Sequence, residues 1–269
     1  MCKIIKVSRS GYYQWLRRPL SNGAISNLAL DAKIKERYKH HKSKYGYRRI
    51  HKEIVIQASA SRVRRRMIAL GLYAIRKGRY KGTTKSNNNE VYADNLLQQD
   101  FHADYPNQKW VSDITEMKIK GKKLYLSVII DLYSRKVIGW SMSSRMRSRL
   151  VCDALHMATL NRGYPRGVIL HSDRGSQYRS LDYQKLISKY GLLCSMSAKG
   201  CCYDNAACES FFATLKTELI YETVFEDREA VKTAIFSYIE AYYNRERLHS
   251  SIGYLSPVIF EQQQFAMVA

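Results

Sequence analysis

The sequence of 269 residues is long enough for a well-filled core and more than one domain, and its hydrophobic content of 45% is that of ordinary globular proteins. It has no run of about 18 apolar residues and no apolar signal segment near its start, so we expect neither membrane insertion nor export, and a cytoplasmic, nucleoid-associated location. A net charge of +22 indicates a polyanionic partner.

The positive charge is concentrated in the first third of the sequence. Residues 1–90 contain 23 Lys and Arg against 4 Asp and Glu, whereas residues 91–269 contain 22 against 19. Lysines kept only for solubility would not gather in one region. The surface that binds the polyanion is therefore expected to be mainly N-terminal.

The six cysteines, at positions 2, 152, 194, 201, 202 and 208, form no C-x-x-C pair. Structural zinc sites usually pair their ligands two to four residues apart, so a zinc site is disfavoured. Free thiols in a reducing compartment are expected.

In chain order, residues 1–24 are predicted to be a helical segment that ends at the Pro and Gly of "RRPLSNG". Three segments with apolar residues at helical spacing follow, "LALDAKIKERYKHH", "GYRRIHKEI" and "SRVRRRMIALGL". They predict a small, basic, all-helical, helix-turn-helix-like domain over residues 25–85.

The third of these segments has the pattern of a DNA-reading helix. Val63, Met67 and Leu70 form an apolar stripe that is predicted to be buried. The arginines on the other side would reach phosphates and base edges, and a plain amphipathic helix with a charged face is the alternative. The DNA contacts predicted from this domain are Arg48, Arg49, Arg62, Arg65 and Arg66.

After a polar linker, assigned to residues 86–104, a core is predicted over residues 105–225. "KWVSDITEMKIK", "LYLSVIIDL" and "SRKVIGWSMSS" indicate three strands joined by short turns. A helix near 148–161, the strand "GVILHSD", a helix near 181–190 and the strand "LLCSM" come next, before helices near 204–220 and 227–243. This order predicts an α/β fold with a mixed sheet, followed by a C-terminal helix and tail over residues 226–269.

Two aspartates occupy unusual places in this pattern. Asp113 lies inside the first predicted strand, and Asp173 directly follows "GVILHS". A carboxylate at a core strand costs desolvation energy unless it is paired or binds a metal. The alternatives are a solvent-facing strand residue for Asp113 and an Asx-type turn for Asp173.

Glu209 is the third acidic candidate. Cys208, Phe211 and Phe212 begin the apolar stripe of its helix, while Glu209 recurs with Asn205 on a second, polar line. Three carboxylates from a strand, a strand end and a helix suit two Mg²⁺ ions, which prefer oxygen ligands.

The spacing and the amino-acid sequences of these motifs resemble those of a known family. There are 59 residues between Asp113 and Asp173 and 35 between Asp173 and Glu209, and the flanking words are "WVSDIT", "VIIDLYSRKVIGW", "HSDRGSQY", "CYDNAACESFFATLKTE" and "YNRERLHSSIGYLSP". Together with "VSRSGYYQWL" and "YGYRRIHKEI", they are similar to the second-frame catalytic subunits of bacterial insertion-sequence DDE transposases, relatives of retroviral integrases.

The resemblance implies a ribonuclease H-like integrase core with a mixed five-stranded sheet, in which Asp113, Asp173 and Glu209 bind two Mg²⁺ ions, with Mn²⁺ as a substitute. It implies DNA strand cleavage and strand transfer, and as partners the element ends, the target DNA, the first-frame helix-turn-helix protein and further copies of the chain. A DNA-binding regulator with an inactive core and a ribonuclease H-like nuclease remain as alternatives.

The resemblance also suggests roles for residues near the carboxylates. Lys216 matches a lysine that contacts the element end, with a solvated surface charge as the alternative. Asn205 is expected to orient the carboxylate, touch DNA or cap its helix; for His171 and Arg174 a phosphate contact and a structural hydrogen bond are both open. Arg247 and His249 match a family motif of unassigned role, with packing of the C-terminal tail as the alternative.

Overall fold

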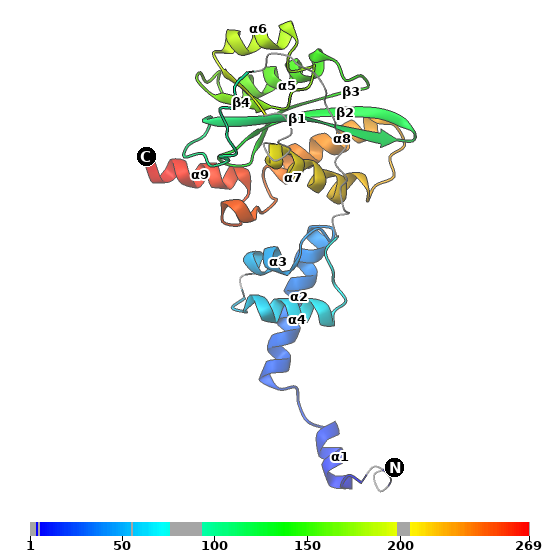
Figure 1. Ribbon diagram of the computed structural model, residues 1–269. Helices are drawn as coiled ribbons and strands as arrows, with labels where there is room; N and C mark the ends of the chain where they lie inside the picture. The colour runs from blue at the N-terminus through cyan, green and yellow to red at the C-terminus, as the bar shows by residue number, and fades with distance from the viewer. Residues whose placement is uncertain (1–3, 5, 55, 76–92, 198–204, 269) are drawn as a thin grey trace. The chain divides into compact units, whose positions relative to one another are not determined.

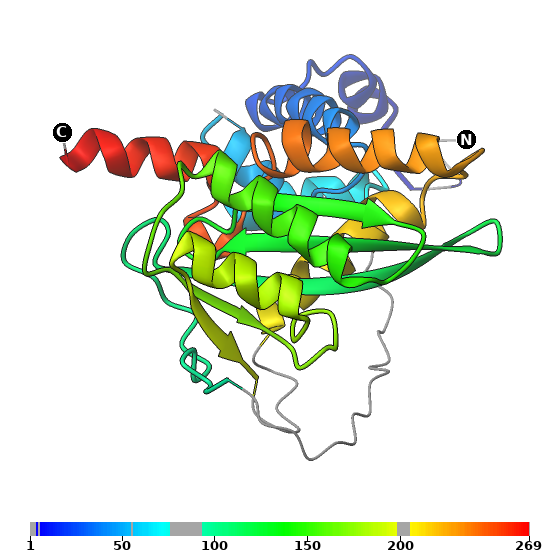
Figure 2. The same cartoon turned by 90° about the horizontal axis from the view of Figure 1, so that it is seen from above.

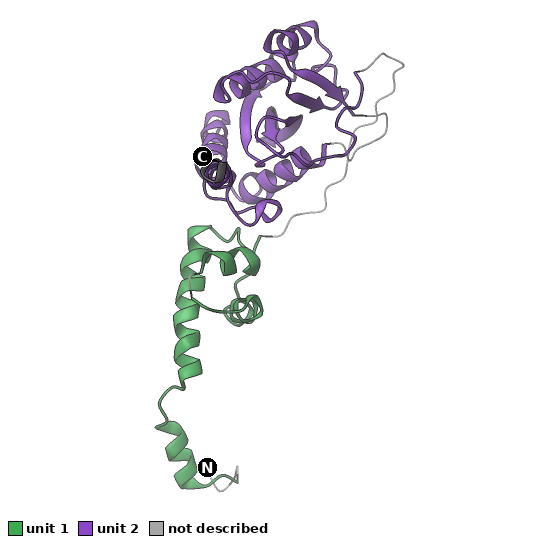
Figure 3. Cartoon of the chain, turned by 90° about the vertical axis from the view of Figure 1, so that its left-hand side faces the viewer, with its two compact units in different colours: residues 1–75 green, residues 76–269 purple. Residues whose placement is uncertain are grey.

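The computed structural model describes residues 4, 6–54, 56–75, 93–197 and 205–268. The chain divides into two compact units, residues 1–75 and residues 76–269 (Figure 3). The predicted boundary between residues 85 and 86 lies outside the described residues. None of the helices in the described ranges combines the length and apolar character needed to cross a bilayer.

The first unit is helical. It contains α1 (Arg9–Leu16), α2 (Asn22–His40), α3 (Tyr47–Glu53) and α4 (Ala60–Ala69). The hydroxyls of Ser8, Ser21 and Ser59 each accept a hydrogen bond from the backbone N–H three residues later, which satisfies one free donor at the start of α1, α2 and α4.

The helices α2, α3 and α4 share one small core. Leu30 and Ile34 of α2 are fully buried with Ile50 of α3 and Val63 of α4. Met67 is buried as predicted, whereas Leu70 caps the end of α4 and is only partly covered. The helix α1 has no buried residue.

The second unit contains a five-stranded mixed sheet, which confirms the predicted fold class. The strands are β1 (Lys109–Ile119), β2 (Lys122–Asp131), β3 (Val137–Ser143), β4 (Ile169–Ser172) and β5 (Leu193–Met196). Their order is β3-β2-β1-β4-β5, in which β1, β2 and β3 form the antiparallel meander and β4 and β5 run parallel to β1.

Helices cover both faces of this sheet (Figures 1 and 2). α5 (Ser148–Asn161) and α6 (Leu181–Tyr190) lie on one face, and α7 (Ala206–Leu215) and α8 (Arg228–Ser237) lie on the other. Two π-helical turns, η2 (Lys216–Ile220) and η3 (Tyr238–Tyr243), extend α7 and α8, and η4 (Ser250–Ile252) and α9 (Pro257–Val268) complete the chain.

The alternation of side chains along the strands produces two hydrophobic cores, one on each face. In β2, Val128 and Ile130 pack toward α7 and α8, whereas Ile129 between them packs toward α5 and α6. In β1, Trp110 and Val111 divide in the same way. A sheet buried on both faces explains why these strands are largely apolar rather than alternating.

Segments expected to flank the core contribute to it. Leu97 and Ala103, from the segment assigned as a linker, are buried in the core on the α7 side. Val231, Ile235 and Tyr238, from the segment assigned as a C-terminal helix and tail, are buried in the same core. The described residues from 93 onward therefore form one packed body around the sheet.

Candidate active site

Asp113 and Asp173 lie at the same level of the sheet because their strands are parallel neighbours. Ser112 of β1 pairs with Ser172, the last residue of β4, and the next residues are Asp113 within β1 and Asp173 just after β4. In open α/β sheets, ligands bind at the carboxyl ends of parallel strands. The two aspartates that the sequence separates by 59 residues thus follow the last residue pair of the ladder between β1 and β4.

A hydrogen bond anchors the start of α7 next to Asp113. The side-chain amide of Asn205 donates to the backbone carbonyl of Ser112 at 3.1 Å, and Asn205 is only 6% exposed. Asn205 occupies the N-cap position but its side chain makes no capping hydrogen bond. One helical turn later, Glu209 is solvent-exposed on α7.

The charges of the other two candidate carboxylates act on Asp113. Burial and the negative charges of Asp173 and Glu209 raise the pKa of Asp113 to about 8, although the N–H of Ile114 donates to its carboxylate at 2.8 Å. A strand carboxylate in this environment is a candidate for a functional role.

The loop after β4 holds Asp173. The N–H of Gly175 donates to Oδ1 of Asp173 at 2.9 Å. This hydrogen bond forms the Asx-type turn that was one of the alternatives for Asp173. The surrounding protein limits hydration and raises the pKa of Asp173, an effect that this hydrogen bond opposes. Asp173 therefore forms an Asx-type turn and also directly follows the strand next to that of Asp113, so the two interpretations of this residue are compatible.

The donor chemistry of the site fits divalent cations. Carboxylate oxygens are the ligands that Mg²⁺ prefers, and Asp113, repelled by Asp173 and Glu209, is the kind of group that a bound cation stabilises in its ionised form. Within the described ranges, no group of three Asp, Glu, His or Cys side chains is arranged closely enough to hold a metal ion.

Lys216 lies beside this site rather than on an open surface. It is the first residue of η2, it is 8% exposed, and the charges of Glu116 and Asp113 act on it. Burial lowers the pKa of its ammonium group more than these two carboxylates raise it. A solvated surface lysine is thus not what the structure shows.

Other residues near the carboxylates form hydrogen bonds within the protein. The ring nitrogens of His171 lie 2.8 Å from Ser195 Oγ and 3.1 Å from Ser197 Oγ, and Nε of Arg174 donates to the carbonyl of Ser197 at 2.6 Å. These bonds tie β4 and its loop to the end of β5. A structural role for both residues is supported, and their contact with DNA stays a prediction.

The sequence analysis did not predict one buried pair of hydrogen-bonded hydroxyls next to the aspartates. The hydroxyls of Ser112 and Tyr178 are 3.1 Å apart, and Tyr178 is 1% exposed. The charges of Asp113 and Asp173 act on this phenol, whose pKa burial raises well above its usual value. The sequence motif "HSDRGSQY" contains Tyr178 five residues after Asp173, but only the fold shows that Tyr178 contacts Ser112 of β1.

The arginines predicted to contact DNA have different environments in the first unit. Arg62 donates to Asn27 and Ser26, and Arg66 forms an ion pair with Asp31, so both link α4 to α2. Arg65 is exposed. The guanidinium groups of Arg48 and Arg49 lie over the rings of Tyr47 and Tyr45.

The C-terminal motif residues make packing contacts. Arg247 forms a buried ion pair with Glu218 of η2, whose Oε2 also accepts from Tyr238. The ring of His249 lies edge-on against Tyr243, and the backbone N–H of His249 donates to the carbonyl of Leu255. These contacts support the packing alternative for both residues.

The cysteines in the described residues are thiols. Cys152, Cys194 and Cys208 are free, and burial raises the pKa of each. The disfavoured zinc set includes Cys201 and Cys202, which lie outside the described residues.

An integrase core is a polynucleotidyl transferase fold, and comparison with known proteins places this chain in that class. The sequence matches the integrase core domain over residues 103–202 and again over residues 209–265. It is 44% identical to the transposase InsF for insertion sequence IS3A of Escherichia coli (strain K12), over 99% of this chain and 94% of that protein. It is 40% identical to an uncharacterized 31 kDa protein of insertion element IS600 from Shigella sonnei, over 100% of both.

A solved structure shares the fold. The chain resembles one from the simian T-cell lymphotropic virus intasome, with a TM-score of 0.50 and 16% identity over 85% of this chain and 74% of that chain. The chain belongs to the IS3-type DDE transposases. Transposases and integrases act on DNA and assemble as oligomers.

Proposed function

We propose that this transposase cleaves DNA at the ends of its insertion sequence and joins them to target DNA, with Asp113, Asp173 and Glu209 binding two Mg²⁺ ions. The observation that carries the proposal is the pairing of Ser112 with Ser172, because the next residues, Asp113 within β1 and Asp173 just after β4, are both aspartates. The Asn205 bond to Ser112 then brings the helix that carries Glu209 to the same place.

Bound Mg²⁺ or Mn²⁺ ions would stabilise charge on the attacking and leaving oxygens of an in-line phosphoryl displacement. The chain itself supplies carboxylates from β1, from the loop after β4 and from α7, and the nearby cation Lys216 would hold a phosphate beside Asp113. The hydrogen bond between the hydroxyls of Ser112 and Tyr178 would help to hold β1 in place.

DNA is bound in this proposal by both units. Arg48, Arg49 and Arg65 of the first unit would contact phosphates, Arg62 and Arg66 would do so while linking α4 to α2, and Lys216, Asn205 and Arg174 would lie along the strand at the active site. The first-frame protein of the same element, as a separate chain or a fusion, would supply further recognition of the ends, in an oligomer of this chain.

The test is strand joining on labelled element ends in Mg²⁺ or Mn²⁺, with the first-frame protein present. Asp173→Asn and Glu209→Gln should abolish joined products while DNA affinity stays within about twofold. The matched control is Asp182→Asn, the same change at an exposed acid in the first turn of α6, which should leave joining intact.

Metal binding has a readout independent of activity. Mg²⁺ should raise the melting temperature of the wild type, since a ligand that binds only the folded state stabilises it, and the rise should be lost in Asp173→Asn. Products in Asp173→Asn would contradict the assignment of the carboxylates. DNA binding without any product in the wild type would favour the regulator, and cleavage without joining would favour the nuclease.

A further inference from the structure

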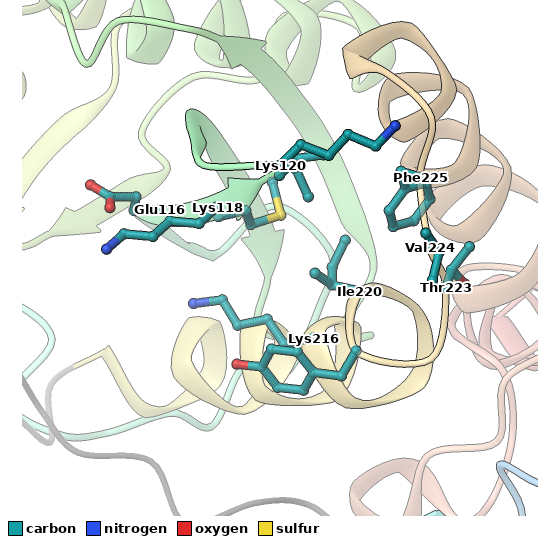
Figure 4. A pocket seen from close by; sticks show the side chains of 11 residues that line it. Glu116, Lys118, Lys120, Lys216, Ile220, Thr223, Val224 and Phe225 are labelled. Atoms are coloured by element: carbon teal, nitrogen blue, oxygen red, sulfur yellow. The ribbon is translucent and has the colours of Figure 1, made fainter.

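A pocket of about 460 Å³ lies where the β1–β2 hairpin meets the segment after α7. Ligand-binding pockets in proteins are typically about 300–1,000 Å³. The lining residues are Glu116, Met117, Lys118, Ile119, Lys120, Lys216, Ile220, Tyr221, Thr223, Val224 and Phe225 (Figure 4).

The pocket has an apolar wall with large apolar side chains at its rim. Met117, Ile119 and Phe225 are buried in the core beneath it. Val224 is 94% exposed and Tyr221 is 68% exposed. An exposed aliphatic and an exposed aromatic side chain in the lining of one pocket, over an apolar wall, provide a surface for a flat apolar group.

The charged side chains of the pocket favour an anion. Three lysines line it against one acid, Glu116, and the carboxylate of Glu116 is already 3.0 Å from Nζ of Lys123, which lies outside the lining. In Figure 4 the amines of Lys118 and Lys216 extend to the same side of the pocket, and Lys120 extends to the other side. Positive charge therefore flanks the apolar wall.

Lys216 connects the pocket to the candidate active site. This residue lines the pocket and also lies within electrostatic reach of Asp113. The π-helical turn that begins at Lys216, with the N–H of Tyr221 bonded to the Lys216 carbonyl at 2.9 Å, places both side chains in the lining. π-helical turns inside helices are frequent at functional sites.

We infer that this pocket binds one unpaired nucleotide of the DNA strand that passes the active site, a conclusion that rests on the proposed function. Lys118 and Lys216 hold the phosphate beside this nucleotide, and the ring of Tyr221 and the side chain of Val224 hold its base. Base stacking on aromatic rings beside a basic groove is how unpaired strands are bound without sequence preference.

The apolar wall decides between an unpaired strand and a duplex. Duplex phosphates would satisfy the lysines, but paired bases are stacked inside the helix and cannot contact Tyr221 or Val224. A neutral protein segment would use the apolar wall but would add no negative charge beside the three lysines.

The test is photocrosslinking of the full-length chain to a 12-nucleotide oligo(dT) that contains one 5-iodo-2′-deoxyuridine. We expect an adduct on Tyr221, mapped by mass spectrometry, in the wild type and equally in the inactive Asp173→Asn. Lys118→Glu should reduce this adduct at least fivefold. The matched control is Lys122→Glu on the opposite strand of the hairpin, outside the lining, which should reduce it less than twofold.

Several results would overturn the inference. These are adducts confined to residues 1–75, equal losses in Lys118→Glu and Lys122→Glu, and competition by a dA·dT duplex as strong as competition by the single strand. A change of oligomeric state in Val224→Arg with an unchanged adduct would show that protein covers the pocket. A Tyr221 adduct in a wild type that joins no DNA would contradict the proposed function and leave this inference standing.

Discussion

Gly175 leaves room for the carboxylate of Asp173 in the loop after β4. A Cβ atom at this position would lie 2.9 Å from Asp173 Oδ1 and 3.0 Å from Gln177 Oε1. Contacts this short require the neighbouring atom to move. The small side chain at 175 is thus a condition for the position of the second aspartate.

Gly175→Ala should therefore reduce strand joining without unfolding the protein. A displacement of the carboxylate by several tenths of an ångström would cost about tenfold or more in rate, because a 1 Å misplacement can cost on the order of 100-fold. Joining rates and melting temperatures should be compared with Gly23→Ala, where the nearest atom is 3.9 Å away. Unchanged joining in Gly175→Ala would show that the loop adjusts freely.

The arginines of α4 separate into structural and exposed groups. Asp31 is 6% exposed, and its hydrogen bond to Arg66 and the charge of that residue lower its pKa below the usual value. Arg65 projects from the same helix into solvent. One helix thus carries both a link to α2 and a candidate phosphate contact.

Arg66→Ala and Arg65→Ala should have different effects. Loss of Arg66 leaves Asp31 without its ion pair and should lower the urea midpoint of the first unit. Loss of Arg65 should leave stability unchanged and reduce the slope of log affinity against log salt by about 0.9, the value for one phosphate contact. An unchanged slope would place the DNA contacts on other residues.

Among the elements, α5 packs unusually close to β3 at Gly139. A Cβ atom there would overlap the backbone carbonyl of Ala154 and lie 2.7 Å from the Cβ of Ala158. Two alanines on the helix and a glycine on the strand allow this approach. The small residues on both elements explain how α5 covers the edge of the meander.

Gly139→Ala should destabilise the second unit by roughly 1–3 kcal/mol, the usual cost of overpacking a filled core. Urea denaturation should show a lower midpoint than for Ser141→Ala, a control on the same strand whose side chain is only partly covered. Equal midpoints would mean that α5 shifts away without cost.

Across the whole second unit, a buried ion network connects the end of the chain to the sheet. Glu261 of α9 accepts from Arg162, Ser134 and Lys136, and Arg162 also pairs with Asp131 at the end of β2. Burial alone would raise the pKa of Glu261, but the hydrogen bonds and charges of its partners together lower it. The ionised form of Glu261 is therefore the one that stabilises the fold.

This network should make stability depend on pH in acid. Because the pKa of Glu261 is lowered on folding, its contribution is complete above the unfolded value near 4.5 and is lost as the pH falls through the folded value. At pH 7, Glu261→Gln should cost roughly 1.5–3 kcal/mol, the range for hydrogen bonds to charged groups. Melting temperatures of the two proteins should converge as the pH falls below 4.5, whereas a constant difference would exclude this role of the ionised side chain.

The sequence by itself determined the order of the elements and the apolar faces that they bury. The helices predicted near residues 148–161 and 181–190 are α5 and α6. Period-2 and period-3.6 patterns are local properties, so one sequence carries them. The motif series also predicted the family, which the 44% identity to the transposase InsF confirms.

Only the tertiary structure decided which side chains meet. The pairing of Ser112 with Ser172, the bond from Asn205 to Ser112 and the buried Tyr178 depend on strand order and register across 60 to 93 residues of sequence. The same is true of Arg66, which reads locally as an exposed arginine and pairs with Asp31. Hydrogen bonds and ion pairs between distant segments follow from packing, and hydrophobic periodicity carries no information about them.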